Sequence, residues 1–363
     1  MAEKKYRVAV VGGAGTWGRH YLRTYAEHPR CQVIALVDRA KDRRQAFADR
    51  YGIPQVFDTV EELLERDLPD IVSVILPVAH TYGAVIACAR AGVRVVSCEK
   101  PIAAELSKAD EIVRLCRECN TILGCGTARW GPYVPQLIDW LRAGNLGALT
   151  GAAMPGGLQR EVSGGSCHDL VLMRLLTGME VEWVEGWTLP PEPNYRAPEA
   201  ADETEVDCPA YGRLGLSGDI VCEVPAPQPG QRISCQVSLT GEGGQAWVCH
   251  PRPVIVQGKG ASSTPVFPDF FNDPLPQNFF IPLIEDLMRA FDTGEDSRCS
   301  GHDYRQVLEI AIAIKLSAHR GHERISLPLA DRSLRLFPHP YRLLGGDIAG
   351  WESIGYTGPP QVM

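Results

Sequence analysis

Three glycines near the N-terminus have the spacing of a phosphate-binding turn. Gly13, Gly15 and Gly18 follow the apolar run Tyr6–Val11, and a helical pattern begins directly after them. Between a strand and a helix, such glycines allow a tight turn, a close approach of pyrophosphate to the backbone and close packing of the helix on the strand. The helix N-terminus adds free N–H donors and the positive end of its dipole. The motif predicts a dinucleotide site; a glycine-rich turn that binds no ligand is the alternative.

A carboxylate follows this motif at the distance expected of a ribose-binding residue. Asp38 ends the next strand-like run, 20 residues after the last glycine of the motif. Its carboxylate would accept hydrogen bonds from the adenosine ribose and repel the 2′-phosphate of NADP, whereas Arg39 would pair with that phosphate. NAD is therefore the favoured cofactor, with NADP as the alternative. The predicted cofactor loop also includes Thr16 and Trp17, and the additional glycine Gly12 allows a register one residue earlier.

A second group of residues with chemical potential is Glu99, Lys100 and Pro101, directly after the strand-like run Arg94–Cys98. In open α/β sheets, ligands bind in the crevice at the carboxyl ends of parallel strands. There the ammonium of Lys100 would orient a substrate hydroxyl and stabilise a developing alkoxide. A lysine before a proline is otherwise an ordinary surface charge, and this alternative stays open.

The elements that must position these residues alternate regularly between strand and helix over residues 1–127. The strand-like runs are short and apolar, as expected of parallel strands covered on both faces, and the alternation predicts a doubly wound α/β sheet. The expected strands are Tyr6–Val11, Gln32–Asp38, Gln55–Phe57, Ile71–Leu76, Arg94–Cys98 and Thr121–Cys125. The expected helices are Trp17–His28, Asp42–Tyr51, Val60–Arg66, Tyr82–Ala91 and Ala104–Cys119.

The pattern changes after Thr127, where longer strand-like segments are joined by Gly, Pro and Asn turns. We expect a second, α+β domain over 128–330, with a large, open, mainly antiparallel sheet. Its strands would be Ala148–Met154, Val181–Leu189, Tyr211–Val224, Ile233–Thr240, Ala246–His250 and Val254–Gln257, and its helices Val134–Ala143, Pro282–Phe291 and Asp303–His319. Pro190–Pro209 reads as a surface loop. The tail 331–363 has no clear period, and is either an arm over a neighbouring subunit or a wrap on its own chain.

Composition excludes several classes of function. The chain has 363 residues, 45% of them hydrophobic, and a net charge of -8, which argues against nucleic acid or an anionic membrane as the main partner. No apolar run has the roughly 18 residues of a membrane span, and the N-terminus lacks a signal-peptide pattern, so we expect a cytoplasmic protein. The 12 cysteines are scattered and are expected to be reduced thiols. The lone CxxC pair, Cys116 and Cys119, gives no metal site, although zinc or redox use is its alternative.

With these residues in view, the sequence resembles the family of glucose–fructose oxidoreductase, inositol 2-dehydrogenase and the rhizopine-catabolism protein MocA. The resemblance runs in order from about Tyr6 to Leu329. It is carried by the glycine motif, Asp38, Glu99-Lys100-Pro101, the segment Gly124–Arg129 with Pro132, and Ser300–Ala318, which looks like a late helix that packs back on the cofactor domain. The family implies an N-terminal Rossmann domain, NAD(P)-dependent oxidoreductase activity and a homo-oligomer, a dimer or tetramer.

The family's substrate-site signature is matched only in part. His168 stands ten residues before Gly178, as the family pattern requires, but Gly164 and Val171 replace its two aspartates. The segment expected near the nicotinamide also departs from the family pattern, because its histidine, His80, comes one position early. Through this segment, Leu76-Pro77-Val78-Ala79-His80-Thr81, the resemblance adds Pro77 and His80 to the predicted cofactor residues, and through Glu99-Lys100-Pro101 it adds Glu99 and Lys100.

The resemblance also implies how the reacting residues divide the work. Lys100 and His168 would flank the reacting carbon, with His168 taking the hydroxyl proton as general base while a hydride passes to the nicotinamide. Arg129, Trp130 and Tyr133 would line the substrate side of the cleft. The alternatives are a packing role at a helix start for His168, an interdomain salt bridge for Arg129, and core packing for the two aromatic residues.

Three functions are consistent with these features. The first is a dehydrogenase of a sugar, glycoside or cyclitol, since hydroxylated rings are the family's commonest substrates. The second is an oxidoreductase of another carbonyl, an imine, a semialdehyde or a dihydrodiol, which the loss of aspartate at Gly164 keeps open. The third is a dinucleotide-binding regulator without catalysis, against which the presence of both Lys100 and His168 counts.

Overall fold

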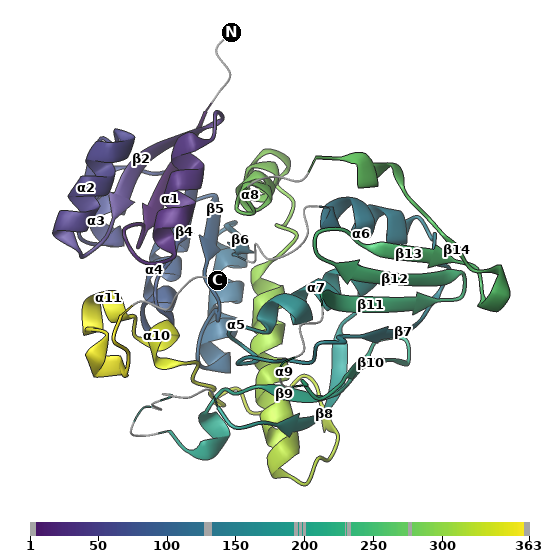
Figure 1. Cartoon of the computed structure of the whole chain (residues 1–363). Coiled ribbons are helices and arrows are strands. Elements are labelled where there is room, and N and C mark those ends of the chain that lie inside the picture. The colour runs from purple at the N-terminus through teal and green to yellow at the C-terminus, as the bar shows by residue number, and fades with distance from the viewer. Residues whose placement is uncertain are drawn as a thin grey trace.

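The first sheet of the protein consists of six parallel strands in the order β3-β2-β1-β4-β5-β6, seen in a computed structural model (Figure 1). The structure describes residues 5–126, 133–191, 195, 198, 201–228, 230, 234–274 and 278–358. The strands are β1 (Tyr6–Val11), β2 (Cys31–Val37), β3 (Gln55–Phe57), β4 (Ile71–Val74), β5 (Val95–Cys98) and β6 (Ile122–Cys125). The helices between them are α1 (Gly18–Glu27), α2 (Lys41–Tyr51), α3 (Val60–Arg66), α4 (Val78–Arg90) and α5 (Leu106–Glu118). This confirms the predicted doubly wound sheet, whose ligand crevice lies where the strand order reverses, between β1 and β4.

The second sheet has nine strands in the order β14-β13-β12-β11-β7-β10-β9-β8-β15 among the described residues. They are β7 (Leu149–Ala153), β8 (Val181–Thr188), β9 (Ala210–Leu216), β10 (Ile220–Val224), β11 (Cys235–Gly241), β12 (Gly244–Cys249), β13 (Val254–Gln257), β14 (Thr264–Pro265) and β15 (Ile325–Ser326). Every neighbouring pair is antiparallel except β7 and β10, which are parallel. The expected mainly antiparallel sheet is therefore present, with one parallel pair.

One predicted strand is wrong: the run Tyr211–Val224 is a hairpin of two strands, β9 and β10. Gly218 and Asp219 lie between them, with φ of 83° and 60°. Two successive residues with positive φ are typical of the tight turns that join antiparallel strands with the right twist. The apolar residues on both sides of this turn hide it in the sequence.

Two helices from the second half of the chain cover the parallel sheet. α8 (Ile281–Thr293) lies against β4, β5 and β6 on the face that α1 also covers, and α9 (Gly301–His319) lies against α5 and β6. α7 (Cys167–Thr177) contacts α9 and β11, and α6 (Val134–Arg142) contacts α7. The predicted boundaries at 127 and 330 stay a prediction.

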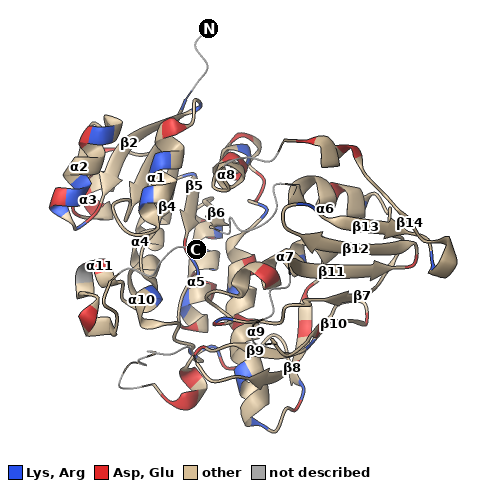
Figure 2. Cartoon of the chain, in the orientation of Figure 1, with Lys and Arg blue, Asp and Glu red and all other residues tan. Residues whose placement is uncertain are grey.

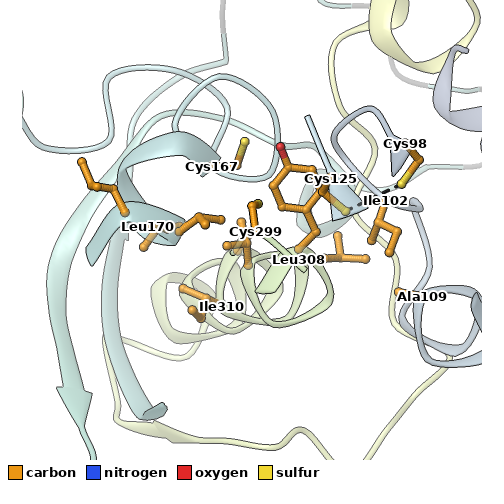
Figure 3. Packing of buried hydrophobic residues seen from close by; sticks show 14 of the residues in the cluster. Cys98, Ile102, Ala109, Cys125, Cys167, Leu170, Cys299, Leu308 and Ile310 are labelled. Carbon is orange, nitrogen blue, oxygen red and sulfur yellow. Dashed lines mark hydrogen bonds between the residues drawn. The ribbon is translucent and has the colours of Figure 1, made fainter. Parts of the chain in front are cut away.

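The apolar core runs without a break from the first sheet through α9 to the second sheet. Figure 3 shows Leu308 and Ile310 of α9 between Ile102 and Ala109 on one side and Leu170 of α7 on the other. All five side chains are buried. The two halves of the chain thus share one apolar cluster, and α9 is the element that joins them.

The C-terminal segment wraps on its own chain. It contains the short helices α10 (Pro340–Leu343) and α11 (Gly346–Ala349) and a turn of 3-10 helix, η4 (Glu352–Ile354). The backbone N–H of Leu106 donates to Leu334, and that of Ser107 to Arg332, which fastens the segment's start to α5. In Figure 1 the yellow helices α10 and α11 lie beside α4, and α10 contacts that helix.

Acidic and basic residues are interspersed along the ribbon, α2 and α3 included (Figure 2). All twelve cysteines are free thiols, and ten of them are buried. Within the described parts of the chain, no helix has the length and apolar character needed to cross a membrane.

Candidate active site

A cleft of about 380 Å³ lies at the carboxyl ends of the parallel strands, where the crevice was expected. It extends from Asp38 and Arg43 at one end to Lys100 and Arg342 at the other. Ten of the eleven predicted cofactor residues line it: Gly15, Thr16, Trp17, Gly18, Asp38, Arg39, Pro77, His80, Glu99 and Lys100. The eleventh, Gly13, is part of the same loop but does not line the cleft, because it faces Leu36. The sequence motifs therefore converge on one elongated site.

The glycine-rich loop turns at Gly12 rather than at Gly13. Gly12 has φ of 77°, and a Cβ there would lie 2.2 Å from the carbonyl oxygen of Ile75. A Cβ on Gly18 would lie 1.9 Å from the carbonyl oxygen of Gly12, so neither position tolerates a side chain. Gly13 instead faces Leu36, 2.5 Å from where its Cβ would be. The tight turn thus lies one residue before the first glycine of the motif, while Gly18 keeps its predicted role in close packing.

Asp38 ties this loop to the end of β2. Its Oδ2 accepts a hydrogen bond of 3.0 Å from the N–H of Ala14, and its Oδ1 accepts one of 2.9 Å from the N–H of Ala40. The carboxylate is buried yet lines the cleft, where its remaining lone pairs suit a ribose hydroxyl. The exposed Arg39 lies at the same end. The glycine loop, which has no side chains at its close-contact positions, the N-terminus of α1 and this carboxylate together fit an NAD molecule.

Lys100 marks the other end of the cleft. Burial lowers the pKa of its ammonium group to about 8, and the guanidinium of Arg342 acts in the same direction. The preceding residue, Glu99, accepts a hydrogen bond of 2.6 Å from the hydroxyl of Tyr21 on α1, which holds the loop after β5 against the Rossmann core. A partly neutral amine beside a cleft is suited to proton transfer near neutral pH.

Arg342 lines this end of the cleft and Glu161 is its buried partner, and neither was expected from the sequence. The Nε atom of Arg342 lies 3.2 Å from Oε1 of Glu161, and both side chains are buried. Burial opposes the ionisation of Glu161, but the charges of Arg342 and Lys100 hold its pKa below the ordinary value. The loop carrying Glu161 is held by Asp207, whose carboxylate accepts hydrogen bonds from the N–H groups of Val162 and Ser163, both 2.9 Å.

The same pair explains the space around Gly164. A Cβ at this position would lie 3.0 Å from Nε of Arg342 and 3.1 Å from Oε2 of Glu161. A carboxylate is thus present beside Gly164, supplied by a residue three positions earlier. The charged pair occupies the space that an aspartate side chain at Gly164 would need.

His168 lies at the start of α7 and is buried, 6% exposed. It does not line the cleft, but its neighbour Cys167 is close enough to Lys100 and Arg342 for both charges to oppose the effect of burial, which raises the pKa of that thiol to about 12. The start of α7 therefore lies beside the Lys100 end of the cleft. The catalytic role of His168 stays a prediction.

Of the three predicted substrate residues, the structure describes Tyr133. Arg129 and Trp130 lie outside the described residues. Tyr133 is buried, its hydroxyl donates to the carbonyl oxygen of Cys249, and it lines a different cavity together with Arg252. A substrate role for Tyr133 stays a prediction that this position does not support, because the hydroxyl is already bonded within the second half of the chain.

One wall of the cleft comes from the C-terminal segment, which sequence patterns did not connect with the site. Its lining residues are Tyr341, Arg342, Gly345, Gly346, Asp347 and Trp351. The segment has no periodicity, so the sequence does not relate it to the glycine loop or to Lys100. Among the described residues, no group of three or more His, Cys, Asp or Glu side chains could hold a metal ion.

Residues 6–127 match the model of a family described as the oxidoreductase family with an NAD-binding Rossmann fold. D-glucoside 3-dehydrogenase of Escherichia coli (strain K12) is 28% identical over 150 residues, which cover 41% of this chain and 42% of that protein. A trans-1,2-dihydrobenzene-1,2-diol dehydrogenase of Mus musculus is 28% identical over 119 residues, which cover 32% of this chain and 35% of that protein. The aligned stretches span less than half the length of these relatives.

Similarity in fold extends further along the chain than similarity in sequence. The structure of levoglucosan dehydrogenase in complex with NADH superimposes with a TM-score of 0.75 over 90% of this chain and 100% of that one, at 17% identity. Residues 6–127 thus match the NAD-binding Rossmann domain of the Gfo/Idh/MocA oxidoreductase family, and the fold is shared over most of the chain.

Proposed function

We propose that the protein is an NAD-dependent oxidoreductase that transfers a hydride between the nicotinamide and a ring hydroxyl or ketone of a sugar, glycoside or cyclitol. The observation that carries the proposal is the single cleft that has the glycine loop and Asp38 at one end and Lys100 at the other. The relatives named D-glucoside 3-dehydrogenase and myo-inositol 2-dehydrogenase support a polyhydroxylated ring as substrate.

NAD, when bound, supplies the hydride acceptor. The glycine loop would hold its pyrophosphate and Asp38 its adenosine ribose, which directs the nicotinamide toward Lys100. The ammonium of Lys100 donates a hydrogen bond to the substrate oxygen and stabilises negative charge on it. When the C–H hydride leaves, the hydroxyl proton passes to a base at this end of the cleft, for which we propose His168.

A second candidate is oxidation of a trans-dihydrodiol, favoured by the relatives of that name in Mus musculus and Xenopus tropicalis. Both candidates involve a secondary alcohol on a ring with a hydroxyl beside it, so the same residues serve both. The third candidate, a regulator without catalysis, predicts cofactor binding with no turnover. A panel of compounds separates the three.

The testing experiment follows reduced-cofactor absorbance with NAD+ or NADP+ across sugars, glycosides, cyclitols and a trans-dihydrodiol. Turnover of a polyhydroxylated ring supports the first candidate, and turnover of the dihydrodiol alone supports the second. Lys100→Met and His168→Ala should each lose at least about 100-fold in kcat, the usual scale for acid–base groups, while NAD+ binding persists. Full activity in both variants would refute the assignment of these residues.

Three further predictions accompany this function. Asp38 favours NAD over NADP because its carboxylate is close to the adenosine ribose position. A dimer or tetramer and a cytoplasmic location also stay predictions from the sequence.

A further inference from the structure

A carboxylate from the C-terminal segment sits on the glycine-rich loop. Oδ2 of Asp347, in α11, accepts a hydrogen bond of 3.2 Å from the backbone N–H of Thr16 and lies 3.3 Å from its hydroxyl oxygen. The other oxygen, Oδ1, forms an ion pair of 2.8 Å with Arg43 of α2. Residues more than 300 positions apart in the chain thus meet in the cleft.

Asp347 accepts from the N–H of Thr16, a backbone donor of the loop that binds pyrophosphate in a Rossmann domain. The N–H groups before α1 and the positive end of its dipole bind the pyrophosphate in a Rossmann domain, and glycine leaves room for that anion. Oδ2 of Asp347 lies only 3.4 Å from where a Cβ on Gly15 would be. A pyrophosphate bound in this way would meet the Asp347 carboxylate at the same N–H donor, where two negative groups repel each other.

The segment around Asp347 has the build of a small flap. α11 is a helix of four residues between Gly345 and Gly350, whose φ values are 72° and 82°, so a glycine in the left-handed region stands at each end. Before it, Arg342 is anchored by Glu161. After it, the hydroxyl of Tyr356 hydrogen-bonds the ring of His339, which closes the segment into a loop. Both ends of the segment are therefore held, and among the described side chains of α11 Asp347 forms hydrogen bonds with the cofactor loop.

We propose that Asp347 is a built-in competitor of the dinucleotide pyrophosphate, and that α11 is a flap that leaves the glycine-rich loop when the dinucleotide binds. Departure of Asp347 frees the N–H of Thr16 for phosphate and the guanidinium of Arg43 for an anionic group of the ligand. Bound cofactor and docked flap exclude each other, so the flap weakens cofactor affinity. The inference rests on the dinucleotide binding in the proposed function and not on hydride transfer.

The first test compares NAD+ affinity in two charge-matched variants. Asp347→Asn removes the carboxylate on the loop, and Glu352→Gln removes an exposed carboxylate of the same segment. The fluorescence of Trp17 and Trp351, which both line the cleft, reports binding. We expect Asp347→Asn to lower the NAD+ dissociation constant by roughly tenfold, the scale of one lost ion pair with its hydrogen bond. Glu352→Gln should leave it within about twofold, as a distant screened charge does.

Equal affinity in the two variants, or weaker binding by Asp347→Asn, would overturn the competition. If neither the wild-type protein nor Asp347→Asn binds NAD+, the proposed function falls together with it. Binding with unchanged affinity refutes the flap alone, so the two failures are distinguishable.

The second test observes the flap without any turnover. The N–H groups of Ala349 and Gly350 donate to the carbonyls of Gly345 and Gly346, and their hydrogen exchange reports whether α11 is docked. We expect exchange at these two amides to accelerate when NAD+ or ADP-ribose is added, and in Asp347→Asn without ligand. Greater protection on adding NAD+ would show that the flap stays down over the cofactor, and would overturn the proposal.

Discussion

Two buried tyrosines close to Glu99 differ in what their hydroxyl groups contact. Tyr21 donates to Oε1 of Glu99 at 2.6 Å, whereas the hydroxyl of Tyr304, on α9, has no hydrogen-bond partner among the described residues. Both side chains are at most 2% exposed. Loss of a hydrogen bond to a charged group costs about 1.5–3 kcal/mol, whereas removal of an unbonded buried hydroxyl costs nothing.

Tyr21→Phe is therefore expected to lower the free energy of unfolding by about 2 kcal/mol, and Tyr304→Phe to leave it unchanged or raise it. Urea unfolding measured by circular dichroism gives both values. The two changes remove the same atom from equally buried rings, so each is the control for the other. A large loss in Tyr304→Phe would mean that its hydroxyl makes a bond that the geometry does not contain.

The lowered pKa of Lys100 predicts the alkaline limb of the activity profile. Burial and the charge of Arg342 bring this pKa to about 8, so the ammonium that steadies the substrate oxygen loses its proton as the pH rises through that value. We expect kcat/KM, which reports ionisations of the free enzyme, to fall above pH 8. Arg342→Met removes the neighbouring cation, so the falling limb should move to higher pH.

The measurement is kcat/KM from pH 6 to pH 10 for the wild-type protein, Arg342→Met and Arg342→Lys. Arg342→Lys keeps a positive charge near Lys100 and should retain most of the lowered pKa. If the falling limb of the kcat/KM profile lies at the same pH in all three proteins, it does not report the ionisation of Lys100. A rise above pH 8 would show that the neutral amine, acting as a base, is the active form.

At the scale of elements, a charge network centred on the buried Glu309 joins α5, α9 and the start of the C-terminal segment. Glu309 of α9 pairs with Arg332 and, at 2.9 Å, with Arg305, and it accepts a hydrogen bond of 2.9 Å from the N–H of Leu329. Asp110 of α5 lies 2.7 Å from Arg332 and 2.8 Å from Arg305. Two guanidinium groups are thus balanced by two carboxylates in a region where Glu309 is 1% exposed.

Glu309→Gln is expected to destabilise the protein by about 3 kcal/mol, because removing the buried carboxylate leaves two partly buried guanidinium groups with one carboxylate between them. Glu118→Gln breaks the exposed pair with Arg114 on α5 and should change little. Thermal and urea unfolding of the two variants make the comparison. Equal stability of the two would mean that solvent screens the network around Glu309 as it does a surface pair.

The elements also show where sequence patterns suffice to predict structure. Buried parallel strands are short apolar runs, so all six were placed within two residues of their ends. α4 begins at Val78, four residues before the predicted start, because its N-terminal residues lie at the cleft and lack helical periodicity. The C-terminal segment has no period at all, and its contacts depend on long-range packing. Asp347 and Arg342 therefore became visible only once the chain was folded.

The site shows the same division between local and long-range information. The glycine loop, Asp38 and Lys100 follow from motifs because each lies at the end of a strand, and parallel strands bring their carboxyl ends together. Glu161 comes from a loop between β7 and α7, held in place by Asp207, and no spacing rule relates it to Lys100. Sequence motifs therefore predict most residues at the cofactor end of the cleft and few of those at the reacting end.

At the scale of the whole molecule, the two sheets are expected to unfold as one unit. One cluster of buried apolar residues extends from the parallel sheet through α9 to the second sheet, and α8 covers the remaining face of the first sheet. Unfolding either half alone would expose the faces of α8 and α9 that the other half covers, with a free-energy penalty of about 25 cal/mol for each Å² of apolar surface. That penalty couples the halves, so an intermediate with one sheet folded should not accumulate.

NAD+ tests this coupling, because the residues predicted to bind it all belong to the half of the chain that contains the parallel sheet. At a free concentration 100 times its dissociation constant, it should raise the free energy of unfolding by about 2.7 kcal/mol. If the halves are coupled, calorimetry shows one transition that moves upward as a whole, and far-ultraviolet circular dichroism coincides with tryptophan fluorescence. Two transitions, of which NAD+ moves only one, would mean that α8 and α9 join the sheets too weakly for cooperative unfolding. The flap and the cleft would then belong to a unit that opens on its own.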